Sequence, residues 1–344
     1  MRHNFSRDES ARNKHRLSTA WLIAVGLVGL LFGVALSISV GAVRIPLHVV
    51  WDAMFQFDPQ TNHHQVIREL RLPRAIAGAL VGAGFAVAGA IMQGMTRNPL
   101  ADSGLLGLNA GAGLALAFCF AFAPQWSYER VMLFCFLGAG LGALLVFGIG
   151  SMARGGLTPV RLTLAGAAVS ALLIALSEGI ALMFRIGQDL AFWYAGGIAG
   201  VQWRQVNVLW PWIAGGVAAA LIISRSITLL SLGEEMAAGL GERIRWVRAT
   251  GTVVVLVLAG AAVSAAGTVG FVGLIVPHVA RFLAGGDYRK IIPCSAVLGA
   301  LLVVYADIGA RMINPPFETP IGALISLIGV PFFLYLARKE KRGL

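Results

Sequence analysis

The segment SRSITLLSLGEEMAAGLGERIRWVR, residues 224–248, is a long polar interruption between two strongly apolar stretches. Within it, Gly233 and Gly241 bracket a run of good helix formers. Glu234 and Glu235 stand at the start of that run, where the helix dipole favours negative charge. The pattern predicts a short amphipathic helix between two membrane spans, which is a surface suited to being gripped by another protein. An ordinary solvated loop is the alternative interpretation.

The composition of the whole chain is typical of a membrane protein. Of its 344 residues, 58% are hydrophobic and 12% are charged, whereas soluble domains carry about 25% charged residues. The apolar residues occur in blocks of about 20, the length at which a helix spans a bilayer. We therefore expect an all-α polytopic membrane protein. The formal charge of +11 does not indicate nucleic-acid binding, because the basic residues follow the membrane topology.

Ten apolar spans are predicted along the chain. The first is too long for a signal peptide, whose apolar region is about 7–15 residues, so we expect it to be retained. The spans are predicted at 17–40, 75–96, 105–123, 131–150, 160–184, 207–226, 246–266, 270–284, 291–311 and 321–337. They form one transmembrane domain over residues 17–338, between a basic N-terminus at 1–16 and a tail at 339–344.

The distribution of positive charge predicts the orientation of these spans. An even number of spans places both termini on the same side of the membrane. With the N-terminus in the cytoplasm, 19 of the 27 Lys and Arg residues fall in cytoplasmic segments, as the positive-inside rule requires. This orientation also places the polar segment 224–248 in the cytoplasm.

Small residues recur at every fourth position in the second and third spans. Such stripes let helix backbones approach closely where no hydrophobic effect drives helices together, so we expect a tightly packed bundle. The small residues are Gly78, Gly82, Ala86, Ala90 and Gly94 in the second span and Gly107, Gly111 and Ala115 in the third.

Charged residues and helix breaks within the apolar stretches are few. Asp307 lies four residues before Arg311, which predicts an ion pair on one helix face. Glu178 in the fifth span is either a functional ionisable group or a residue that faces a wet cavity without chemistry. The segment 97–102 is expected to break the second span's helix, and Pro277 to interrupt the eighth span.

Enzyme motifs are missing from the sequence. It has no nucleophile elbow, no HExxH and no paired carboxylates on a shared face, so no catalytic residue is predicted. None of the four lysines follows a glycine, which excludes a phosphate-binding loop and places any ATP hydrolysis on a partner. The three cysteines lie in apolar spans without paired spacing, and the adjacent His63 and His64 have no third ligand nearby, so neither a disulfide nor a metal site is expected.

Several motifs in fixed order closely resemble the iron-siderophore and vitamin B12 ABC-importer permeases. The resemblance runs from about residue 66 to the C-terminus. It rests on RLPR at 71–74, GAIMQGMTRNPLADSGLLGLNAGA at 89–112, FWYAGGIAGVQW at 192–203, LGEEMAAGLG at 232–241, GTVGFVGLIVPHVARFL at 267–283, ADIGAR at 306–311 and ETPIGALISLIGVPFFLYL at 318–336.

The resemblance implies an architecture and a set of partners. Proteins of this family are type II ABC-importer permeases with ten spans, and two permease subunits, identical or different, enclose a central pathway. They bind two cytoplasmic ATPase subunits, which hold ATP and Mg, and receive substrate from an extracytoplasmic binding protein. No cofactor on this chain and no nucleic-acid partner is implied. The expected location is the plasma (inner) membrane of a bacterium or archaeon.

The resemblance also assigns roles to individual residues. It makes 227–245 the cytoplasmic coupling segment that fits a groove on the ATPase, through Leu232, Gly233, Glu234, Glu235, Ala237, Gly239, Leu240 and Gly241. It matches the docking arginines for the binding protein to Arg71, Arg74 and Arg311. It makes the fifth span a wall of the pathway, where Glu178 lies, with a cytoplasmic gate near Thr158 and Pro159. Some relatives carry small hydroxyl residues where this chain has Pro159 and Val160, so a hydroxyl-lined gate does not follow here.

Two points refine these assignments. Ala237 and Leu240 are three residues apart, so they share a helix face, and we expect that face to pack into the ATPase. The most favoured cargo is a ferric siderophore, with haem and cobalamin as alternatives. From another class of protein, an ion-coupled secondary transporter would use Glu178 and the broken helices, but it would have no ATPase to grip.

Overall fold

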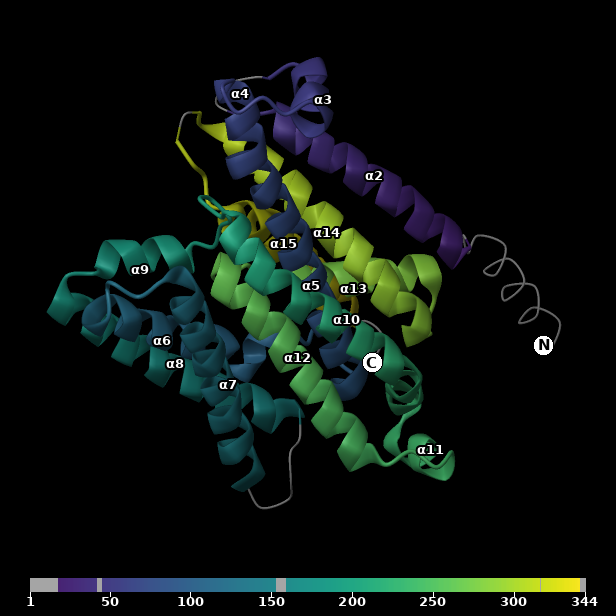
Figure 1. Cartoon of the computed structure of the whole chain (residues 1–344). Helices are drawn as coiled ribbons and strands as arrows, with labels where there is room; N and C mark the ends of the chain where they lie inside the picture. Colours follow the sequence, from purple (N-terminus) through teal and green to yellow (C-terminus); the bar gives the residue numbers. More distant parts are fainter. Residues whose placement is uncertain (1–17, 42–44, 153–158, 316, 341–344) are drawn as a thin grey trace.

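The computed structural model describes residues 18–41, 45–152, 159–315 and 317–340, and within these ranges the chain forms helices and no strands (Figure 1). This agrees with the all-α class expected from the composition. The long helices lie side by side as a bundle, with the short helices α3, α4 and α9 at one end and α11 at the other. We refer to these as the α9 end and the α11 end.

Each of the ten predicted spans corresponds to one helix. The ten are α2 (Thr19–Ser39), α5 (Leu72–Thr96), α6 (Leu108–Phe122), α7 (Tyr128–Met152), α8 (Pro159–Phe184), α10 (Trp203–Leu232), α12 (Ile244–Ala266), α13 (Val272–Ala284), α14 (Tyr288–Ile313) and α15 (Ile321–Glu340). Seven of the described helices are long and apolar enough to cross a membrane, and α6, α13 and α15 are shorter apolar helices. The chain is therefore a multi-pass membrane protein, and ten crossings stays a prediction.

Short helices connect the spans. They are α3 (Leu47–Phe55), α4 (Asn62–Gln65), the π-helix η1 (Val66–Arg71), the 3₁₀ helix η2 (Ser103–Leu106), α9 (Gly187–Tyr194) and α11 (Glu234–Gly239). Trp51 and Phe55 are exposed on α3, and their ring centroids lie 4.4 Å apart. The expected break after α5 is present, because Arg97 adopts φ 52° and ends the helix.

Helix α5 is the core of the bundle and packs against α14, α12, α10 and α13. Its small residues lie against the backbones of neighbouring helices. A Cβ atom added to Gly82 would lie 2.1 Å from the Gly299 carbonyl oxygen of α14, and one added to Gly89 would lie 2.0 Å from the Gly273 carbonyl oxygen of α13. A larger side chain therefore cannot occupy either position without displacing a helix.

The third span shows the same kind of contact. A Cβ atom on Gly111 of α6 would lie 2.1 Å from the Gly138 carbonyl oxygen of α7, and Gly142 lies similarly close to Gly107. Helices α6, α7 and α8 form a group on the side of the bundle away from α2 (Figure 1). The tight packing expected from the small-residue stripes is confirmed in both spans.

One predicted helix break is misplaced. Pro277 lies inside α13, which continues through it, so the expectation of an interruption there is wrong. The backbone instead breaks before α13, where Gly267 and Phe271 both have φ 67°. Glycine tolerates this left-handed conformation and phenylalanine does so at a cost, so the glycine is the signal that marks the break. The break lies at the α9 end, where the Gly197 amide donates to the Ala266 carbonyl at 2.8 Å.

Candidate functional site

The coupling segment forms a short helix between α10 and α12. Gly233 at φ 133° ends α10 and turns the chain into α11, and Gly241 at φ 87° turns it out again. Both glycines adopt positive φ values that other residues rarely reach, which explains their positions in the sequence. Glu234 and Glu235 occupy the first turn of α11, as the pattern predicts. The short helix is confirmed, and its role in coupling stays a prediction.

The exposed face of this segment differs from the expected one. Ala237 is completely buried within its own chain, so the prediction that it packs into an ATPase is wrong. Leu232 at the end of α10, Met236 on α11 and Leu240 at its C-cap are 58%, 58% and 63% exposed, and we refer to these three apolar residues as the exposed strip. Met236 was missed from the sequence, although its spacing of four residues from Leu240 was a visible signal.

Charged side chains hold the coupling helix at its base. The Arg248 Nη2 atom of α12 lies 2.5 Å from a Glu234 carboxylate oxygen, and the Arg97 guanidinium after α5 lies 3.9 Å from the same oxygen. Ser226 of α10 donates to Glu242 at 3.0 Å. Glu235, Gly239 and Gly241 are exposed. Because the ion pairs are also substantially exposed, their side chains remain within reach of a partner.

At the α9 end the three predicted docking arginines lie in or beside an ionic cluster, which we define as Arg74, Asp307, Arg311 and Glu318. Arg74 lies 2.8 Å from Asp307 and 2.7 Å from Glu318. Arg311 lies 3.0 Å from Asp307, which confirms the ion pair expected within α14. Asp307 is 1% exposed and Arg311 is 9% exposed. The cluster joins α5, α14 and the segment before α15, and its two positive and two negative charges balance.

Arginines from this region also bind the end of α2. Arg311 donates to the Ser37 hydroxyl at 2.6 Å and to the Val40 carbonyl at 3.0 Å. Arg71 donates to the Ile38 carbonyl at 2.6 Å. These contacts satisfy carbonyl groups that the last turn of a helix leaves without partners, and positive charge is favourable there.

The docking role of these arginines stays a prediction. The Arg74 side chain is only 11% exposed, so a carboxylate on a binding protein would have to displace Glu318 to reach it fully. Glu318 itself is 42% exposed, and its hydrogen bonds from Arg74 hold the pKa of this carboxyl below its ordinary value. Sequence spacing did not predict the role of Glu318, because its partner Arg74 lies 244 residues away in the chain.

The predicted gate is only partly described. Thr158 lies outside the described residues, and Pro159 begins α8 without a described side chain. Glu178 is exposed on α8, whereas its neighbour Ser177 is buried and donates to the Gly113 carbonyl of α6 at 3.2 Å. Helix α8 thus packs one face on α6 and turns the face with Glu178 away from its own bundle.

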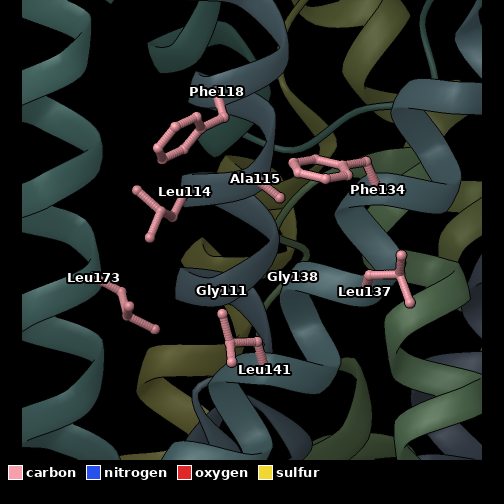
Figure 2. A pocket seen from close by; sticks show the side chains of 9 residues that line it. All are labelled: Gly111, Leu114, Ala115, Phe118, Phe134, Leu137, Gly138, Leu141 and Leu173. Atoms are coloured by element: carbon pink, nitrogen blue, oxygen red, sulfur yellow. The ribbon is translucent and has the colours of Figure 1, made fainter.

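Two hollows flank α6. One, of about 390 Å³, lies between α6, α7 and α8 and is lined by apolar and small residues (Figure 2). Phe118 and Leu114 of α6 face Leu173 of α8 across it, and Phe134 and Leu137 come from α7. The other, of about 570 Å³, lies at the α9 end and carries polar and aromatic side chains. Among the described residues no group of three or more His, Cys, Asp or Glu side chains could hold a metal ion.

Comparison with known proteins places this arrangement in a family. The FecCD transport family matches residues 29–339. The chain belongs to the FecCD transport family. This FecCD protein is 55% identical over 323 residues to the iron(3+)-hydroxamate import system permease protein FhuB of Bacillus subtilis (strain 168), covering 94% of this chain and 84% of the relative.

More distant relatives extend the likeness. The ferric enterobactin transport system permease protein FepD of Escherichia coli (strain K12) is 39% identical over 320 residues, covering 92% of this chain and 95% of FepD. A solved structure of a metal-chelate type ABC transporter in an inward-facing conformation matches with a TM-score of 0.81 at 27% identity, covering 93% of this chain and 99% of that one. The type II importer permease fold expected from the sequence is therefore confirmed.

Proposed function

We propose that this FecCD protein is the transmembrane permease subunit of an ABC importer that moves a ferric siderophore into the cytoplasm. The observation that carries the proposal is the exposed strip of Leu232, Met236 and Leu240, which lie on and directly beside the short helix α11 between two spans. A secondary transporter has no ATPase subunit that such a helix could bind. The relatives named for iron–chelate import support the cargo, with haem and cobalamin as the alternatives.

The remaining partners follow from the same proposal. Two cytoplasmic ATPase subunits bind α11 and hold ATP and Mg, and a binding protein delivers the chelate at the α9 end. A second permease subunit covers α8. The exposed face of α8 supports this, because it carries Glu178 among apolar residues, and a carboxylate facing lipid is costly. That face then lines a pathway between two subunits.

Transport by the reconstituted complex tests the proposal. The permease, its ATPase and its binding protein are placed in proteoliposomes, and uptake of radioactive iron chelate is measured with and without enclosed ATP. We expect uptake that requires ATP and survives ionophores that collapse ion gradients. Uptake that persists without ATP and stops with the ionophores would establish a secondary transporter instead.

Thiol labelling tests the orientation. The native Cys119, Cys135 and Cys294 are 1–3% exposed, so a thiol introduced as Leu240→Cys is the accessible one. A membrane-impermeant reagent should label it only from the cytoplasmic side. Labelling of intact cells from outside would reverse the topology and remove α11 from reach of any ATPase.

A further inference from the structure

The larger hollow beside α6 has the size and lining of a small-molecule site. Its volume of about 570 Å³ lies within the range of about 300–1,000 Å³ typical of ligand pockets. It lies where the ends of α6, α7 and α12 meet α9 and the segment 197–201. The aromatic side chains in its lining are Phe120, Trp126, Tyr128, Phe192 and Trp193.

Hydrogen bonds hold the walls of this cavity together. The Tyr128 hydroxyl donates to the Ser264 and Ala265 carbonyls at 3.4 and 3.3 Å, which ties α7 to the end of α12. The Gly197 amide donates to the Ala266 carbonyl, which ties the segment after α9 to the same helix end. The cavity is therefore formed by fixed elements around the break between α12 and α13.

The charge of the cavity is negative. Asp189, in the first turn of α9, is the charged residue of the lining, and none of the described lining residues is basic. Gln188 and Gln205 supply further polar groups. The nearby Arg204 is paired with Glu129. Phe192 also lines a second, small hollow, whose other lining residues include Arg74 and Glu318 of the ionic cluster. The charges of that cluster balance, so it does not offset the charge of Asp189.

We propose that this cavity receives the ferric chelate on entry and that Asp189 makes it select uncharged and cationic chelates over anionic ones. The inference rests on the proposed function and names its substrate class. Hydroxamates carry one negative charge each, so three of them neutralise Fe³⁺, whereas catecholate and citrate chelates are anionic. Aromatic faces attract a cationic or weakly polar surface, and Asp189 repels negative charge.

The two hollows beside α6 differ in what they can recognise. The groove between α6, α7 and α8 has apolar side chains and no group that could orient a polar chelate (Figure 2). Two phenylalanines of α6, two residues apart, line different hollows, since Phe118 faces the apolar groove and Phe120 lines the polar cavity. A chelate with hydrogen-bonding groups therefore fits the cavity at the α9 end.

Charge reversal tests the proposal. The reconstituted importer carries Asp189→Lys, Asp189→Asn or the control Glu69→Lys, a carboxylate that is exposed on η1 at the same end and outside the lining. Each variant is given the cationic ferric desferrioxamine B and the neutral ferrichrome at subsaturating concentration. The ratio of the two uptake rates is compared with that of the unchanged importer, so that selectivity of the binding protein cancels.

We expect Asp189→Lys to lower the cationic-to-neutral ratio about tenfold, with an effect that weakens as salt is raised, and Asp189→Asn to lower it less. Glu69→Lys should leave the ratio within about twofold. An unchanged ratio in Asp189→Lys, or an equal change in Glu69→Lys, would overturn the proposal. If the unchanged importer takes up an anionic catecholate chelate but neither of these two, the proposal is also overturned. Failure with all three chelates would instead refute the proposed function, and monodisperse purification shows that each variant folds.

Discussion

The two ends of α5 carry arginines in opposite situations. At the α9 end, Arg74 is 11% exposed and binds the almost fully buried Asp307. At the α11 end, Arg97 is 51% exposed and lies at the limit of ion-pair distance from Glu234. Buried pairs cannot be released without leaving an uncompensated charge, whereas exposed pairs exchange partners at little cost. Ion pairs within the chain therefore fasten the α9 end of the bundle, whereas the charged side chains at the α11 end remain available to a second protein.

The largest expected effect comes from breaking the fastened end. Asp307→Asn leaves Arg74 and Arg311 without their shared carboxylate, and loss of one partner from a buried ion pair costs about 3–5 kcal/mol. We expect a large fall in the melting temperature of the detergent-purified protein. Asp52→Asn on α3 provides a control that touches no part of the cluster. A melting temperature unchanged by Asp307→Asn would show that the cluster does not hold the helices together.

The next comparison is between a buried and an exposed residue of the coupling segment, Ala237 and Leu240. Ala237→Asp places a carboxylate in a fully buried position and should cost several kcal/mol of stability. Leu240→Asp changes an exposed position, so we expect an unchanged melting temperature and at least about a tenfold loss of ATPase co-purification. Both quantities are measured on both variants. Undiminished ATPase binding by Leu240→Asp would remove the exposed strip from the coupling interface.

Acid should loosen the fastened end through Glu318. Hydrogen bonds from Arg74 hold the pKa of this carboxyl below its ordinary value of 4.5. Its contribution is therefore fully present above about pH 4.5 and is lost as the pH falls through the lowered pKa. Because the side chain is 42% exposed, we expect at most about 1 kcal/mol. Melting temperatures at about pH 6 and about pH 3.5 should differ less in Glu318→Gln than in the unchanged protein, and equal differences would contradict this.

The smallest effect is expected at the available end. Glu234→Gln removes an exposed carboxylate that faces Arg248 and Arg97, and exposed ion pairs contribute about 0.2–1 kcal/mol. The melting temperature should therefore change little. A fall as large as that of Asp307→Asn would mean that the two ends of α5 do not differ in the way their exposure indicates.

Sequence patterns predicted the elements better than their contacts. Hydropathy located all ten apolar helices, and glycine spacing located α11, because both signals are local. Ala237 is buried because α11 packs against α10 and α12, and a local sequence pattern does not contain information about that packing. Glu318 and Arg74 meet across a separation of 244 residues, so only the fold brings them together. Pro277 was misread because the missing hydrogen bond of a proline can be tolerated in a packed helix, whereas the glycine at 267 marks the true break.

The contacts between glycine backbones have a consequence for the history of this sequence. At Gly82, Gly89 and Gly111 even the methyl group of alanine would overlap a carbonyl oxygen of the next helix. Any larger side chain at these three positions is therefore excluded, whichever molecule the importer carries. Asp189 in the lining of the cavity beside α9 is instead exposed, so its replacement displaces no helix backbone. Descendants of this chain that acquire a different cargo should therefore keep the glycines and change around Asp189.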